Sequence, residues 1–128
     1  MRSAWTYPVR AESVTAARRD ARRVMADLPL AYEVELVVSE LATNALRHGA
    51  RYAEDGEIRL ELIFGDDGVE VAVTDPGVHL WSGQAVPPDE ASTSGRGLAI
   101  VEVLAAKLGH RMADGAQTVW ALLPWEAE

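Results

Sequence analysis

The spacing of apolar residues divides this chain into a helical first part and a later part that alternates as strands do. Residues 12–28 and 30–48 carry apolar side chains three and four positions apart, which predicts two amphipathic helices. Pro29 interrupts the helical pattern between them, and Gly49 is expected to end the second helix. Because so short a turn joins the two helices, we expect them to pack side by side.

Strand patterns occupy much of the remaining sequence. Apolar and polar residues alternate over residues 58–64 and again over 69–73, which is typical of strands with one buried face. Residues 65–68 read Gly-Asp-Asp-Gly and are a strong hairpin signal between these two strands. Further elements are expected as follows: an edge strand over 5–9, a helix over 95–108 capped by Gly109, and strands near 110–113 and 117–123.

This order of elements predicts an α/β chain of the α+β type, a two-layer sandwich of three helices on a mixed, mostly antiparallel sheet. A length of 128 residues is sufficient for one hydrophobic core, so we expect a single domain over 1–128. Residues 78–94 have no regular period and contain Pro87 and Pro88. A segment of that length between regular elements is usually functional, and we interpret residues from about 76 to 94 as a lid.

Composition narrows the possible functions. The formal net charge is −8, which argues against direct binding to nucleic acid. There are no cysteines, which excludes disulfides and thiolate metal sites and fits a reducing compartment. No apolar run approaches the length of a membrane span, and the N-terminus lacks the apolar core of a secretion signal. We therefore expect a cytoplasmic protein without membrane contact.

Positive charge is concentrated in the first part of the chain. Residues 1–23 contain six arginines and two acids, whereas residues 24–128 contain six basic and eighteen acidic residues. The basic cluster has two interpretations, a docking site for an acidic protein partner or a solvated helix face. Its members are Arg18, Arg19, Arg22 and Arg23.

The second predicted helix carries three polar residues on one stripe. Glu40, Asn44 and His48 are four positions apart, so their side chains point the same way. Their neighbours on the helix are largely apolar, and burial of a carboxylate or carboxamide costs several kcal/mol unless a partner compensates. Acid and amide oxygens at this spacing suit a hydrated Mg²⁺ and a proton to be removed. Taken alone, the stripe is more typical of the polar edge of an amphipathic helix.

Three further segments strengthen the indication of a binding site. Asp75 begins an Asp-Pro-Gly turn at a strand end, where an acceptor-only carboxylate suits an exocyclic amino group such as that of adenine. Residues 94–98 open a predicted helix, whose free N–H groups and dipole favour phosphate. Thr118 places a hydroxyl at the start of the final predicted strand. Each segment alone is commonplace, but together they indicate a nucleotide site.

The ordered set of motifs resembles the Bergerat-type ATP-binding fold of the GHKL superfamily, which includes histidine kinases, gyrase-type ATPases and heat-shock chaperones. It is most similar to the anti-sigma-factor serine/threonine kinases. The motifs correspond as follows: ExxxN to residues 40–44 (ELATN), DxGxG to 75–79 (DPGVH), GxGL to 95–98 (GRGL) and G-x-x-T-V-W to 115–120 (GAQTVW). The resemblance extends over nearly the whole chain.

The resemblance implies ATP and Mg²⁺ as cofactors and assigns roles to individual residues. Asn44 would hold the Mg²⁺ that bridges the phosphates, and Glu40 would accept the proton of a protein serine or threonine as it attacks the γ-phosphate. Asp75 would read adenine, while His48 is either an ATP contact or a packing residue at the helix end. The other expected ATP contacts are Gly77, Gly95, Arg96, Gly97, Leu98 and Thr118.

The leading hypothesis is a protein serine/threonine kinase that phosphorylates an antagonist protein and sequesters a sigma factor, and we expect a homodimer. Two residues depart from the family pattern: His79 replaces the second glycine of DxGxG, and Gln117 occupies a position where many relatives carry a lysine. These departures favour a second hypothesis, a non-catalytic partner-switching module with a degraded ATP site. A third hypothesis is the ATP-binding module of a phosphorelay regulator, which would require a phosphoacceptor helix pair that the sequence does not show.

Overall fold

The computed structural model describes residues 1–52, 56–75, 98–113 and 116–126, apart from the side chains of residues 48–52 and Ala113. The predicted lid falls outside these ranges. So do four of the predicted nucleotide contacts, Gly77, Gly95, Arg96 and Gly97.

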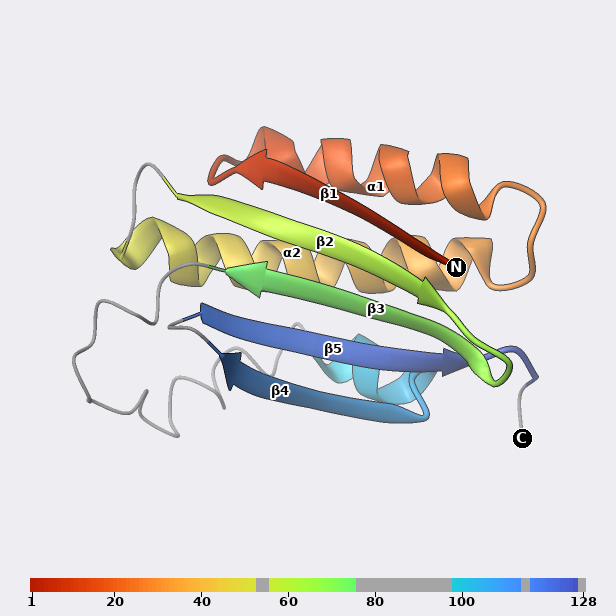
Figure 1. The fold of residues 1–128 in the computed structure, drawn as a ribbon. Helices are drawn as coiled ribbons and strands as arrows, with labels where there is room; N and C mark the ends of the chain where they lie inside the picture. The colour runs from red at the N-terminus through yellow and green to blue at the C-terminus, as the bar shows by residue number, and fades with distance from the viewer. Residues whose placement is uncertain (53–55, 76–97, 114–115, 127–128) are drawn as a thin grey trace.

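A five-stranded sheet forms one layer of the molecule (Figure 1). Its strands are β1 (Arg2–Pro8), β2 (Glu57–Phe64), β3 (Gly68–Asp75), β4 (Lys107–Ala113) and β5 (Ala116–Pro124). They are arranged in the order β1-β2-β3-β5-β4, and each pairing between these described strands is antiparallel. The predicted α+β sandwich with a mostly antiparallel sheet is therefore confirmed, as is the position of the first strand at an edge.

Two long helices, α1 (Glu12–Met25) and α2 (Ala31–Tyr52), pack side by side on one face of this sheet (Figure 1). Residues 98–104 form a shorter helix on the same side. The core lies between the two layers, where Met25 and Leu41 are among the largest fully buried side chains. Burial of such a side chain contributes about 1.5–3 kcal/mol. None of the helices within the described ranges combines the length and apolar character needed to cross a lipid bilayer.

Both long helices end at positions that differ from the expected ones. The backbone of Ala26 has a φ of 37°, which ends α1 at Met25 rather than near Leu28. In contrast, α2 continues through Gly49 to Tyr52, so the predicted stop at Gly49 is wrong. A glycine inside a helix costs only about 1 kcal/mol relative to alanine. The packed turns of α2 that precede Gly49 outweigh this cost.

The segment after the short helix differs most from the sequence-based expectation. The helical period predicts a helix up to residue 108, but the helix ends at Leu104 and β4 follows. β4 pairs with β5 along its whole length, so strand pairing overrides the local period. Gly109 lies within β4 opposite Trp120, and a Cβ added to it would be 2.7 Å from Cζ2 of the Trp120 ring. Gly109 therefore permits close packing of that ring and does not cap a helix.

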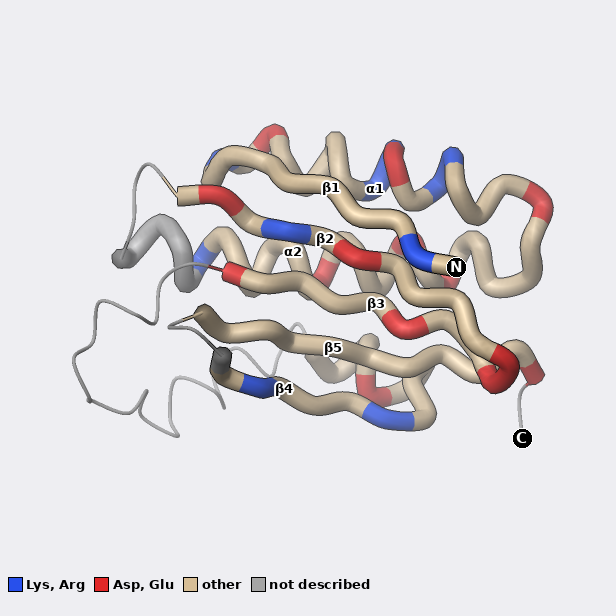
Figure 2. The backbone as a smooth tube through the Cα atoms, viewed as in Figure 1, with Lys and Arg blue, Asp and Glu red and all other residues tan. Residues whose placement is uncertain are grey.

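Basic and acidic positions both occur along α1 (Figure 2), and most of its arginines are paired with carboxylates. Nη2 of Arg18 lies 3.2 Å from Oε1 of Glu35, and Nε of Arg22 donates a hydrogen bond of 3.1 Å to Oε2 of the same carboxylate. This bond from Arg22 is the main reason that the pKa of the Glu35 carboxyl is lowered. Arg23 lies 3.5 Å from Asp20. Three of the four arginines in the basic cluster are thus paired, which favours a solvated helix face.

Candidate functional site

The end of β3 places a carboxylate inside the protein. Alternate residues of β3 face the helices, and Val71 and Val73 are fully buried there. Asp75 is next in this alternation and is only 2% exposed. A carboxylate at that depth requires polar partners or a ligand to compensate for the loss of water. The structure thus brings Asp75 to the helix-facing side of the sheet, at the end of a strand.

The C-terminal half of α2 contributes a buried carboxamide to the same end of the molecule. Asn44 is 7% exposed, and its Oδ1 is a buried acceptor without a hydrogen-bond partner among the described residues. Leaving a buried acceptor unsatisfied costs about 1–3 kcal/mol. Figure 1 shows this part of α2, the end of β3 and the start of β5 at one end of the sandwich. Asn44 therefore presents an oxygen suited to a ligand or ion at that end.

Glu40 lies one helical turn before Asn44 on α2 and is half-buried. The i, i+4 spacing places the two side chains on one stripe of the helix, as the sequence predicts. His48 is one turn further along α2, and its side chain falls outside the description. The roles assigned to these three residues stay predictions.

Two other predicted nucleotide contacts lie on different parts of the structure. Leu98 begins the short helix and packs, half-buried, against the core. Thr118 pairs with Thr74 across β3 and β5, and the two hydroxyl oxygens are 2.7 Å apart. Because Thr74 and Asp75 are consecutive strand residues, their side chains point to opposite faces of the sheet. The described geometry therefore places Thr118 on the face opposite to Asp75.

Gln117 is the residue of β5 that lies directly beside Asp75, on the same face of the sheet. Asp75 and Gln117 are paired in register, and Val119 continues the same alternation into the core. The Oε1 atom of Gln117 is buried and has no hydrogen-bond partner among the described residues. Counting back in twos from the buried Val119 identifies Gln117 as the residue beside Asp75, and the ATP contact expected at Thr118 stays a prediction. From the sequence, Gln117 was noted only as a position where many relatives carry a lysine.

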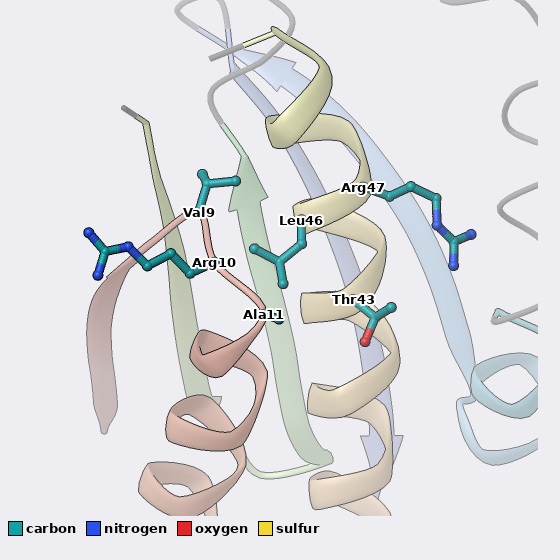
Figure 3. A pocket seen from close by; sticks show the side chains of 6 residues that line it. All are labelled: Val9, Arg10, Ala11, Thr43, Leu46 and Arg47. Carbon is teal, nitrogen blue, oxygen red and sulfur yellow. The ribbon is translucent and has the colours of Figure 1, made fainter. Parts of the chain in front are cut away.

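A separate hollow lies between α2 and the segment that joins β1 to α1 (Figure 3). It has a volume of about 340 Å³ and is lined by Val9, Arg10, Ala11, Thr43, Leu46 and Arg47. Figure 3 shows Leu46 pointing from α2 toward Val9, whereas the exposed Arg47 points away on the opposite side of the helix. Glu40 and Asn44 do not line this hollow. It is therefore distinct from the polar stripe.

Residues 7–122 match the family described as the histidine kinase-like ATPase domain. The match covers most of the chain, and the protein belongs to this family, as the ordered motifs indicated. The fold is also similar to that of the solved RsbU and RsbW domains of a Mycobacterium tuberculosis protein, with a TM-score of 0.69 and 22% identity. That alignment covers 97% of this chain and 32% of the other.

Similar sequences include two bacterial regulators. The anti-sigma F factor of Clostridium beijerinckii is 30% identical over 95 residues, which cover 68% of this chain and 66% of that protein. The serine-protein kinase RsbW of Listeria monocytogenes is 32% identical over 74 residues, which cover 55% of this chain and 47% of that protein. The matched part thus spans slightly less than two thirds of the first relative and about half of the second.

Proposed function

We propose that this protein is an ATP-binding regulator of the anti-sigma type, which phosphorylates a serine or threonine of an antagonist protein and sequesters a sigma factor. The observation that carries the proposal is the buried Oδ1 of Asn44, without a partner among the described residues, one turn after the half-buried Glu40. Similarity to an anti-sigma F factor and to serine-protein kinases supports the choice of partners.

The residues of the site fit Mg·ATP. Mg²⁺ takes oxygen ligands and usually keeps several waters, so the single orphaned oxygen of Asn44 suits it. When bound, Mg²⁺ would neutralise negative charge on the phosphates during phosphoryl transfer. The carboxylate of Asp75 accepts a hydrogen bond from the amino group of adenine. Burial of Asp75 and Asn44 keeps water from competing for both interactions.

Glu40 would act as the proton acceptor in phosphoryl transfer. The partner's hydroxyl oxygen forms a bond to the γ-phosphorus while the bond from that phosphorus to the bridging oxygen breaks and ADP leaves. The hydroxyl proton passes to the Glu40 carboxylate. Packing of α2 on β3 fixes Glu40 relative to Asn44 and Asp75, which is the main requirement for a reaction that depends on positioning.

A second candidate function is a non-catalytic partner-switching module. The observation that favours it is the uncharged Gln117 at the position where the family pattern expects a lysine. The only lysine of the sequence, Lys107, pairs with Leu122, five residues along β5 from Gln117. No lysine is therefore placed near this end of β5 to bind phosphate.

Calorimetric titration with Mg·ATP, followed by a phosphotransfer assay, separates the two candidates. The chain and its Asp75→Asn variant are titrated, and the chain is then incubated with labelled ATP and antagonist proteins encoded in the same genome. Micromolar binding that weakens in the variant, together with phosphoserine or phosphothreonine on an antagonist, is the expected result. Binding without any transfer would favour the second candidate, and no binding at millimolar ATP would contradict nucleotide recognition.

A further inference from the structure

We propose that the hollow between α2 and residues 9–11 is the docking site of the antagonist protein, which places an apolar side chain in the hollow and acidic side chains beside Arg10 and Arg47. The inference rests on the proposed function, because it assumes that an antagonist protein delivers a hydroxyl group to Glu40. It adds the surface that holds this partner and the chemistry by which the partner is recognised.

The wall of the hollow that joins β1 to α1 is fixed by hydrogen bonds near both of its ends. The N–H of Val9 donates a hydrogen bond of 3.2 Å to the carbonyl oxygen of Gly56. Oγ of Ser13 donates one of 2.5 Å to the carbonyl oxygen of Pro8. The hollow, with a volume of about 340 Å³, is therefore formed before a partner binds, as most binding pockets are.

Apolar side chains line the hollow from both sides. Val9 and Leu46 are half-buried and pack against the core, and Figure 3 shows Leu46 pointing toward Val9. Ala11 adds a small, exposed side chain. In the described part of the chain, no acidic residue lines the hollow. It can therefore bury an apolar side chain of a partner, and such anchors in pockets contribute much of the affinity of protein interfaces.

The two arginines that line the hollow, Arg10 and Arg47, are exposed and have no carboxylate partner among the described residues. Most other arginines with described side chains do have one. A carboxylate oxygen lies within 4.0 Å of the guanidinium groups of Arg2, Arg18, Arg22, Arg23, Arg59 and Arg111. In a chain with a net charge of −8, two unpaired arginines at an apolar hollow indicate charge complementarity to an acidic partner.

The position of Arg47 connects the hollow with the proposed site of phosphoryl transfer. Arg47 follows Glu40 by seven residues, so both lie on one side of α2. Figure 3 shows the Arg47 side chain pointing away from the hollow, across the helix from Leu46. A partner segment anchored beside Leu46 therefore passes Arg47 before it reaches Glu40. Because Asn44 does not line the hollow, a docked partner leaves the nucleotide site accessible to ATP.

The test measures the binding of antagonist proteins encoded in the same genome, in the presence of a non-hydrolysable ATP analogue so that no phosphate is transferred. Arg10→Glu reverses an exposed charge at the hollow, and Ala11→Phe fills part of the hollow from an exposed position. Arg19→Glu is the matched control. Arg19 is exposed on α1 and has no carboxylate partner among the described residues, but it does not line the hollow. Thermal unfolding verifies that each variant is folded.

We expect Arg10→Glu and Ala11→Phe each to weaken binding of the antagonist about tenfold or more, whereas Arg19→Glu should change it by no more than about twofold. All three variants should bind Mg·ATP as tightly as the parent, because none of the substituted residues belongs to the nucleotide site. Rising salt should weaken binding of the antagonist to the parent more than to Arg10→Glu, since salt screens the charge of Arg10.

Equal affinities of the parent, Arg10→Glu and Ala11→Phe for an antagonist that the parent phosphorylates would overturn this inference and leave the proposed function intact. Equal losses in Arg10→Glu and Arg19→Glu would also overturn it, because they would reflect net charge and not a docking site. A parent that binds none of the antagonist proteins would overturn the partner in the proposed function and this inference with it.

Discussion

The hydroxyl of Tyr7 donates a hydrogen bond of 2.6 Å to Oδ2 of Asp20, which joins the edge strand β1 to helix α1. Burial of Tyr7, followed by this bond and the charge of Asp20, raises the pKa of the phenol above its ordinary value. The unfolded chain releases this proton near pH 10, whereas the folded protein keeps it to higher pH. The stability contributed by the raised pKa is therefore fully present below about pH 10 and is lost as the pH rises toward the folded-state pKa.

Tyr7→Phe should lower the free energy of unfolding by about 1–2 kcal/mol at pH 7, since the hydrogen bond to a carboxylate is lost. Urea unfolding measures this change. Above about pH 10, the parent should lose stability more steeply than the variant, because the variant has no phenol to ionise. Tyr32→Phe is the control, because Tyr32 is 70% exposed. Parallel profiles of stability against pH for the parent and Tyr7→Phe would show that ionisation of Tyr7 does not cause the loss of stability at high pH.

Gly109→Ala should destabilise the protein by about 1–3 kcal/mol, the usual cost of overpacking. The added methyl would lie 2.7 Å from Cζ2 and 2.9 Å from Cε2 of Trp120, so the indole must move. Chemical denaturation followed by tryptophan fluorescence measures the change in stability. Gly65→Ala is the matched control, because the nearest atom to its Cβ would be 3.9 Å away. Equal effects of the two substitutions would refute the steric explanation.

Asn44→Leu should abolish Mg²⁺-dependent ATP binding without loss of the fold. Because Oδ1 of Asn44 has no partner among the described residues, its removal relieves a buried unsatisfied acceptor. The free energy of unfolding should then stay within about 1 kcal/mol of the parent value or rise. Calorimetry with Mg·ATP and thermal unfolding measure the two quantities. Thr43→Val, which removes only a bond to the carbonyl of Ser39 on the same helix, should leave ATP binding unchanged.

Glu40→Ala should retain ATP binding and lose phosphotransfer, because its carboxylate is proposed to accept a proton only during the reaction. A loss of about 10²–10⁴ in the transfer rate is expected for removal of a general base. Single-turnover transfer of labelled phosphate to the antagonist protein measures the effect. Glu33→Ala, two turns earlier on α2, provides a control on the same helix. Transfer at the parent rate by Glu40→Ala would exclude Glu40 as the base.

Much of the fold could be predicted from local patterns, because period and turn chemistry act over short distances. The alternation around the Gly65–Gly68 turn predicted β2 and β3 almost to the residue. The same reasoning failed at residues 105–109, where the spacing of Leu104 and Leu108 suits a helix as well as a strand. Pairing with β5 decides between the two, and that partner lies further along the chain.

The site was only partly predictable for a related reason. The positions of Glu40 and Asn44 follow from helical spacing, and their shared stripe needs no other element. The relation between Asp75 and Gln117 depends on the register of two strands that are far apart in the sequence. A shift of that register by one residue exchanges the faces, and it would bring Thr118 rather than Gln117 beside Asp75.

The strand order also affects how the nascent chain matures. β5 is inserted between β3 and β4, although it is the last of the described strands to be synthesised. Until it emerges from the ribosome, β3 and β4 each present an unpaired edge, and Gln117 has not yet joined Asp75. Completion of the central sheet and pairing of Gln117 with Asp75 thus both wait for β5. A translation product that stops before β5 would therefore lack both the continuous sheet and the pairing of Gln117 with Asp75.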